Sequence, residues 1–218
     1  KPVGWSSFNV VAKLRGALRA LCGHKVKVGH AGTLDPLASG LLILGTGKCT
    51  KLLPHLTAED KAYTATLRLG SITASYDAET PQEDPRPWEH IDLPAVEAAL
   101  AGFRGAIQQH PPLFSAKRFN GERAYFLARK GEDVQLPAAE VRIDQLTVTR
   151  FAAGELELDV HCSKGTYIRS LAHDIGQALG CGAHLSALRR TRSGTFHVAD
   201  ARTPQGWSEW LDQWIAER

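Results

Sequence analysis

The sequence contains no methionine and no long hydrophobic run, and it has only four cysteines and 7% aromatic residues among 218 residues. No apolar run approaches the roughly 20 residues of a transmembrane helix, so no membrane segment is expected. The cysteines form no CxxC pair, which favours a reducing, cytoplasmic location over a disulfide framework. Because position 1 is lysine, we do not expect the sequence to be the whole translation product. Its length suits one large domain or two small ones.

Acidic residues are almost absent from residues 1–52, where Asp35 is the only one among eight lysines and arginines. Further basic residues gather in 113–130 and 164–192, whereas seven acidic residues gather in 75–109. If the basic segments converge in space, they form a face of the kind that binds polyanions such as RNA. Composition alone also allows three ordinary solvated surfaces.

Apolar periodicity predicts an α+β fold, because helices and strands are mixed without a strict βαβ repeat. Helical spacing predicts helices over 7–21, 93–103, 121–130, 166–180 and 207–218. Strand patterns cover 40–47, 61–70, 141–151, 155–162 and 183–198, with a hairpin around Gly154 and a turn near Gly194. The proline-rich stretch 77–94 is typical of a surface connection. Three tryptophans in 207–218 have no evident packing partner.

The sequence does not match several common motifs of catalytic and binding sites. GTGKCTK (45–51) is not a phosphate-binding loop, because Leu42 stands where the first glycine is required and Cys49 replaces the serine or threonine. A zinc site formed by His161, Cys162, Cys181 and His184 would have its ligands at spacings that match no familiar template. No hydrolase or dinucleotide-binding motif is present.

Asp35 lies in HAGTLDPLASG (30–40), where an Asp before Pro36 is by itself typical of a turn. A carboxylate kept ionised by nearby cations is also a competent nucleophile or base. No second carboxylate lies at a fixed spacing, which argues against glycoside hydrolysis. Tyr167 and Arg169 are the candidate partners of Asp35. Tyr167 could instead be a half-buried aromatic anchor, and Arg169 could be a solvated helix residue. On a regular helix they would point about 200° apart. Both therefore reach one site only if Tyr167 precedes the helix or the helix end is irregular.

Six blocks in succession resemble the TruB family of pseudouridine synthases. They are KPVGWSS (1–7), GHAGTLDPLASGLLILGTGKCTK (29–51), KAYTATLRLG (61–70), QHPPLFSAKRFNGERAYFLARKG (109–131), CSKGTYIRSLAHDIG (162–176) and GCGAHLSALRRTRSG (180–194). The resemblance extends over essentially the whole chain, and the pattern GHxGTLDPxAxG is highly specific.

The resemblance implies a pseudouridine synthase fold, with a mixed, largely antiparallel central sheet flanked by helices. Residues 1–202 would form the catalytic domain, with an RNA-gripping insertion at about 108–138. The helix 203–218 would stand where the small C-terminal RNA-binding domain of many bacterial members begins. The implied activity is isomerisation of uridine to pseudouridine at position 55 in the T arm of tRNA. The expected enzyme is a cytoplasmic monomer that needs no metal, organic cofactor or protein partner.

The resemblance also assigns residues to the site. Asp35 would initiate cleavage of the glycosidic bond, Tyr63 would stack on the target base, and Arg169 would pair with the aspartate. Tyr167 and Leu188 would line the uracil pocket, and His30 would lie beside the flipped nucleotide. Further RNA contacts are expected from Lys117, Arg118, Lys164, Arg189 and Arg190.

Physical reasoning supports this assignment, because a uridine inside a folded RNA arm must be extruded before its glycosidic bond can react. Aromatic and apolar walls would hold the base, and cations would hold the flanking phosphates. Two alternatives stay open at this point: a catalytic core that depends on a guide RNA, and a tRNA chaperone without catalytic activity.

Overall fold

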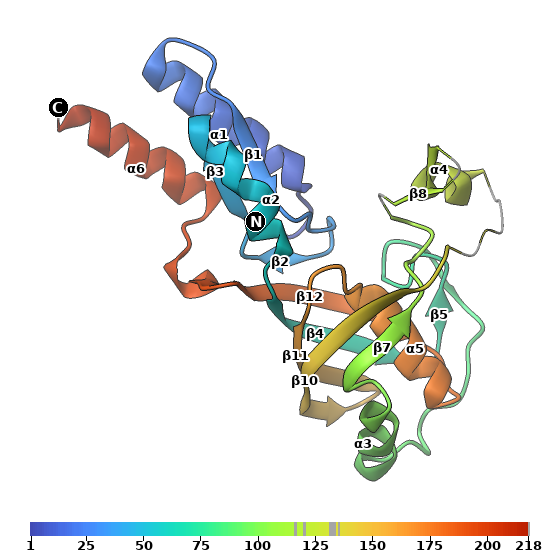
Figure 1. Cartoon of the computed structure of the whole chain (residues 1–218). Helices are drawn as coiled ribbons and strands as arrows, with labels where there is room; N and C mark the ends of the chain where they lie inside the picture. Colours follow the sequence, from blue (N-terminus) through green and yellow to red (C-terminus); the bar gives the residue numbers. More distant parts are fainter. Residues whose placement is uncertain (116, 120, 131–133, 135, 218) are drawn as a thin grey trace. The chain divides into compact units, whose positions relative to one another are not determined.

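The computed structural model describes residues 1–115, 117–119, 121–130, 134 and 136–217, and only the backbone of residues 118, 123, 215 and 216. The chain divides into two compact units. Unit 1 consists of Lys1–Tyr63 and Leu188–Arg218, and unit 2 of Thr64–Ala187. Both units mix helices and strands, which confirms the α+β class (Figure 1). No helix among the described residues is long and apolar enough to cross a membrane.

Unit 1 is built from short strands and the two longest helices of the described chain. Its elements are α1 (Ser7–Cys22), β1 (Val28–Ala31), β2 (Ser39–Gly40), β3 (Ile43–Thr46), η1 (Gly47–Leu52), α2 (Leu53–Ala58), β13 (Phe196–His197), η2 (Val198–Asp200) and α6 (Pro204–Ala216). The expected strand over 40–47 is thus interrupted, because β2 and β3 pair with different strands. GTGKCTK forms the end of β3 and the start of η1.

Helix α1 begins where Ser6 caps it, because the Ser6 Oγ accepts a hydrogen bond from the Asn9 N–H at 3.1 Å. It ends at Gly23, whose left-handed backbone (φ 69°) is typical of a helix C-terminus. The helix buries Val10 and Val11. These local signals explain why the helix expected over 7–21 appears almost unchanged.

The strands of unit 1 bring β12 (Ala183–Ser193) beside the loop that follows β1. β1 and β3 pair antiparallel, whereas β2 pairs parallel with β12, with Gly40 opposite Arg190. Gly40 has φ +103°, and a Cβ atom there would lie 2.2 Å from the Arg190 carbonyl oxygen. Only glycine therefore fits this crossing. β12 also pairs with β13, so the turn expected near Gly194 is confirmed.

Helix α6 begins three residues earlier than expected, because Thr203 caps it by accepting the Gly206 N–H at 3.0 Å. Trp207 and Trp210 meet edge to face at 5.1 Å between ring centroids, and the Arg202 guanidinium lies over both rings. Together with side chains of α1 they line an apolar cavity of about 480 Å³. Trp207 and Trp210 thus have partners that the sequence did not reveal.

Unit 2 contains an antiparallel hairpin of β10 (Ala139–Ala152) and β11 (Glu155–Cys162), which confirms the turn at Gly154. Its strands follow the order β12-β4-β11-β10-β7, where β4 is Lys61–Leu69 and β7 is Gly105–Gln109 (Figure 1). The first three residues of β4 and the last six of β12 belong to unit 1. Alternate residues of β11 are buried, as the sequence pattern predicts. The buried residues are Leu156, Leu158, Val160 and Cys162.

The helices of unit 2 are α3 (Leu93–Ala101), α4 (Ala124–Arg129) and α5 (Ile168–Ala178). α5 buries an apolar face that includes Leu171 and Ile175. Short strand pairs complete the unit. They are β5 (Ile72–Thr73) with β6 (Gln82–Glu83), and β8 (Arg118–Phe119) with β9 (Glu122–Arg123). The helix expected over 121–130 is therefore shorter, since β9 occupies its first residues.

Candidate active site

Asp35 lies in the loop between β1 and β2, where its carbonyl accepts the Ala38 N–H at 3.0 Å and closes a tight turn. The side chain is partly exposed. Burial lowers the pKa of the Lys1 ammonium from its ordinary 10.5, and the negative charge of Asp35 partly opposes that shift. The aspartate therefore lies close enough to a cation to interact with it electrostatically, as the sequence led us to expect.

Both neighbours of Asp35 are fixed to the start of the chain. The Leu34 N–H donates to the Ser7 Oγ at 2.8 Å, and the Ser7 hydroxyl donates to the Leu34 carbonyl at 3.1 Å. On the other side, the Pro36 carbonyl accepts the Gly4 N–H at 2.8 Å. The backbone that carries Asp35 is thus held immediately before and immediately after it.

Arg190 holds the two ends of the same loop. Its Nε donates to the Leu41 carbonyl at 2.8 Å, and one of its terminal nitrogens donates to the Gly32 carbonyl at 3.2 Å. The residue is only 2% exposed. Its guanidinium is therefore engaged by backbone carbonyls inside unit 1, and the expected contact of Arg190 with RNA stays a prediction.

His30 lies on β1 opposite Leu44 and is half-buried. Burial lowers the pKa of its imidazole from the ordinary 6.5; a hydrogen bond to the Gly32 backbone opposes this shift, and the charge of Arg190 adds to it. The lowered pKa favours the neutral imidazole, which suits contact with a nucleobase better than contact with a phosphate.

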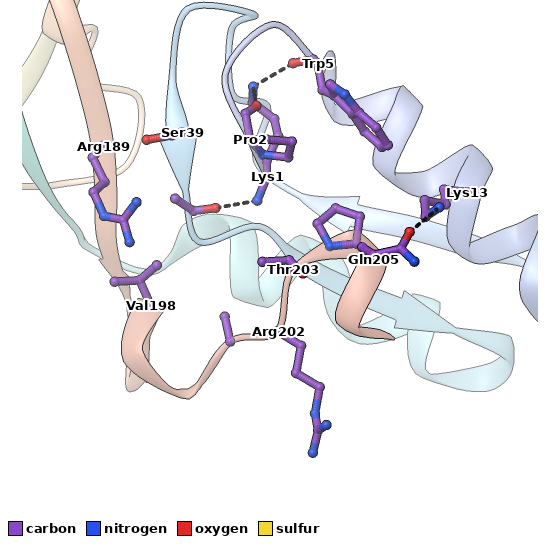
Figure 2. A pocket seen from close by; sticks show the side chains of 13 residues that line it. Lys1, Pro2, Trp5, Lys13, Ser39, Arg189, Val198, Arg202, Thr203 and Gln205 are labelled. Carbon is purple, nitrogen blue, oxygen red and sulfur yellow. Dashed lines mark hydrogen bonds between the residues drawn. The ribbon is translucent and has the colours of Figure 1, made fainter. Parts of the chain in front are cut away.

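A cavity of about 460 Å³ lies in unit 1 at the β2 end of the loop (Figure 2). Four basic residues are among those that line it, and no acidic residue is. The basic residues are Lys1, Lys13, Arg189 and Arg202. Arg189 is exposed, unlike its neighbour Arg190, so of the two arginines it is the one available to an anionic ligand.

In unit 2, Arg169 is buried at the start of α5 and meets a carboxylate there. Its Nε lies 3.6 Å from the Asp77 Oδ2, with the two side chains 6% and 1% exposed. The Arg169 guanidinium also donates to the carbonyls of Ser75 (3.2 Å) and Phe114 (3.0 Å). The sequence placed Asp77 in a surface connection, which is wrong because the residue is fully buried.

The turn that carries Asp77 is shaped by short polar contacts. The Asp77 Oδ1 accepts the Ser75 hydroxyl at 2.6 Å and the Glu79 N–H at 3.0 Å. Between them Tyr76 adopts a left-handed backbone (φ 63°), and its ring stacks on His173 at 4.0 Å between centroids. The proline-rich sequence after Asp77 indicates a surface segment. The small residues around Asp77 were the only feature of the sequence that could have indicated its burial.

Tyr167 precedes α5 as its N-cap residue, with an extended backbone (φ −96°, ψ 108°). The helix expected over 166–180 therefore begins two residues later, at Ile168, and one of the two conditions under which Tyr167 and Arg169 could reach one site is met. The side chain of Gln109 fixes this residue, because its Oε1 accepts the Tyr167 N–H at 2.8 Å and its Nε2 donates to the Tyr167 carbonyl at 3.0 Å. Sequence reasoning missed Gln109.

The other expected residues fall in both units. Tyr63 is half-buried on β4 and Leu188 half-buried on β12, both in unit 1. Lys117 and Lys164 are exposed in unit 2, and the side chain of Arg118 lies outside what the structure describes. Asp35 belongs to unit 1 and Arg169 to unit 2, so their pairing stays a prediction.

Comparisons with known proteins identify the class. Residues 19–168 match the model of the TruB family pseudouridylate synthase N-terminal domain, and residues 169–212 match that of the tRNA pseudouridylate synthase B C-terminal domain. A protein of Phocaeicola vulgatus named tRNA pseudouridine synthase B is 50% identical over 98% of this chain and 91% of its own length. One of Thermobifida fusca with the same name is 48% identical over 100% and 73%.

Solved structures agree with this class. The chain superposes with a TM-score of 0.75 and 30% identity on a structure titled "Crystal Structure of a Cbf5-Nop10-Gar1 Complex", covering 100% of this chain and 54% of that one. The matches define an enzyme of the pseudouridylate synthase class. This chain belongs to the TruB family of that class.

Proposed function

We propose that this enzyme isomerises uridine to pseudouridine at position 55 in the T arm of tRNA, with Asp35 initiating the reaction. The observation that carries the proposal is the loop in unit 1, which holds Asp35 between two anchored neighbours, Leu34 and Pro36. Fixed backbone on both sides gives a carboxylate the defined position that catalysis requires. The motif around it is the one that resembles the family most specifically.

In the proposed mechanism the target nucleotide leaves the RNA stack and enters a pocket between aromatic and apolar side chains. Tyr63, Tyr167 and Leu188 would supply these walls. Asp35 initiates cleavage of the bond between the ribose C1′ and the uracil N1. The base then rotates, C1′ bonds to C5, and the C5 proton is lost while N1 gains one. The product is therefore an isomer of the substrate.

Arg169 would balance the charge of Asp35 in this pocket. Its own burial and its contact with Asp77 fix the guanidinium within unit 2. The Asp77 carboxylate, which contacts this arginine, keeps the guanidinium oriented before any substrate binds. Exposed cations would hold the phosphates beside the flipped nucleotide. These are Lys117, Lys164 and Arg189, with Arg118 as a further candidate.

We also propose that the protein acts as a cytoplasmic monomer, without guide RNA, cofactor or protein partner. Relatives named tRNA pseudouridine synthase B are 48–50% identical to this chain, whereas the chain spans only about half of the solved structure whose title names an H/ACA RNP, at 28% identity. The closer likeness to the tRNA enzymes favours action on tRNA directly. The domain boundary near residue 202 is part of the same proposal.

The test uses the purified chain and an unmodified tRNA transcript, with pseudouridine mapped at nucleotide resolution. We expect product at position 55 with protein alone, and none on a transcript that carries cytidine there. Asp35→Asn should lower the single-turnover rate by about three orders of magnitude or more, while the Kd for tRNA stays within about tenfold. Asp212→Asn, on the exposed part of α6, is the matched control and should behave as the unmodified sequence does. A comparable loss of rate and binding in Asp35→Asn would show that Asp35 is structural.

A further inference from the structure

Ser7 makes two hydrogen bonds to one residue that lies 27 positions away in the chain. Its Oγ accepts the Leu34 N–H at 2.8 Å and donates to the Leu34 carbonyl at 3.1 Å. Ser7 is 3% exposed and Leu34 is 4% exposed, so neither bond competes with bulk water. A single hydroxyl thus satisfies both polar backbone groups of Leu34 inside the protein.

These two bonds act on the peptide groups on either side of Leu34. Each peptide group is planar, and the Leu34 carbonyl belongs to the plane that continues into the backbone N–H of Asp35. Holding the N–H and the carbonyl of Leu34 therefore fixes both planes, and with them the direction in which the chain enters Asp35. The Gly4 N–H fixes the Pro36 carbonyl after it.

Ser7 is not needed to cap α1, although it is the first residue of that helix. Ser6 performs this task, since its Oγ accepts the Asn9 N–H while the Asn9 side chain accepts the Ser6 N–H at 2.8 Å. The two neighbouring serines thus have separate roles. Ser6 stabilises the helix, and Ser7 holds the loop.

We propose that Ser7 is a positioning residue for pseudouridine formation, acting through Leu34 on the orientation of the Asp35 carboxylate. This inference rests on the proposed function, in which Asp35 initiates the reaction. We do not expect Ser7 to contact the substrate. Its hydroxyl limits the rotation of the backbone before Asp35, so its loss should affect the rate of chemistry more than the binding of tRNA.

The neighbouring serines provide a matched pair of variants, Ser7→Ala and Ser6→Ala. We expect Ser7→Ala to lower the single-turnover rate at saturating enzyme by about ten- to a hundredfold, because a displacement of about 1 Å at a reacting group has effects of this size. Its Kd for tRNA should stay within about threefold. Ser6→Ala removes a helix cap and should lower the thermal midpoint, but its rate below that midpoint should stay within about twofold.

Ser7→Thr, which keeps the hydroxyl, should recover part of the rate that Ser7→Ala loses. All rates are measured at a temperature where unfolding curves show each variant fully folded. A Ser7→Ala rate within twofold of the unmodified chain would overturn the inference, as would equal losses in Ser6→Ala and Ser7→Ala. Asp35→Asn in the same assay separates the two proposals. If Asp35→Asn reacts as fast as the unmodified chain, the proposed function fails. If Asp35→Asn loses its rate but Ser7→Ala reacts as fast as the unmodified chain, only the inference about Ser7 fails.

Discussion

Replacing Arg190 with methionine should destabilise unit 1 although no acidic partner is lost. The guanidinium is buried and donates two hydrogen bonds, to the carbonyls of Leu41 and Gly32. Methionine fills much of the volume of the arginine stem but donates to neither carbonyl. Arg190→Met therefore removes the side-chain link between the two ends of the Asp35 loop, while the main-chain bond from the Leu41 N–H to the Arg190 carbonyl persists.

The magnitude follows from those two bonds. Hydrogen bonds from a charged donor contribute about 1.5–3 kcal/mol each, so their gross loss is about 3–6 kcal/mol. Removing a buried cation also removes its desolvation penalty, which offsets part of this loss. We expect the free energy of unfolding to fall by about 2–4 kcal/mol in Arg190→Met. Arg190→Lys, whose single ammonium can reach one of the two carbonyls, should lose about half as much.

Equilibrium unfolding in urea measures this difference, with Arg189→Met as the matched control on the adjacent position of β12. Arg189 is exposed, so its replacement should change the free energy of unfolding by no more than about 0.5 kcal/mol. In tRNA binding, Arg189→Met should reduce the salt slope by about 1 if this residue contacts a phosphate. An Arg190→Met variant as stable as Arg189→Met would show that the two side-chain hydrogen bonds of Arg190 do not stabilise the loop.

Two further predictions concern unit 2. Asp77→Asn removes the carboxylate charge from the buried Arg169, so the free energy of unfolding should fall by about 3 kcal/mol in urea titrations, and the single-turnover rate should fall more than the affinity for tRNA. An unchanged rate would show that Asp77 does not act through Arg169. Burial lowers the pKa of His173 from its ordinary 6.5. The unfolded chain therefore binds a proton at a higher pH than the folded chain does, and the free energy of unfolding should decrease as pH falls through 6.5. His173→Phe keeps the stack on Tyr76 and should flatten this decrease between pH 7.5 and 5.5; an equally steep decrease in that variant would assign it to other groups.

The sequence predicted the elements whose signals are local. Ser6 and Gly23 delimit α1, and the alternation in β11 marks its buried face. Tyr167 was placed within the expected helix 166–180, and helix geometry indicated only that it could share a site with Arg169 if it preceded the helix or the helix end was irregular. Caps, turns and periodicity act within a few residues, so they can be read without knowing the rest of the fold.

The contacts that hold the candidate site could not be predicted in this way. Asp77 and Arg169 are 92 positions apart, and the prolines that follow Asp77 assigned it to a surface connection. Arg190 was grouped with Arg189 because both are basic, although strand alternation turns one inward and leaves the other exposed. Composition reports the charge of a residue but not its burial. Long-range partners such as Ser7 and Leu34 become visible only in the folded chain.

The central claim is that the carboxylate of Asp35 performs chemistry and does not serve to bind RNA. Its most direct test is the pseudouridine formed at position 55 in a single turnover, with Asp35→Asn protein in saturating excess over the tRNA. Saturation removes any effect of weaker binding from the measurement. We expect the tRNA to be fully bound and essentially no pseudouridine to form within the time in which the unmodified chain completes the reaction. Conversion at a rate close to that of the unmodified chain would contradict the central claim.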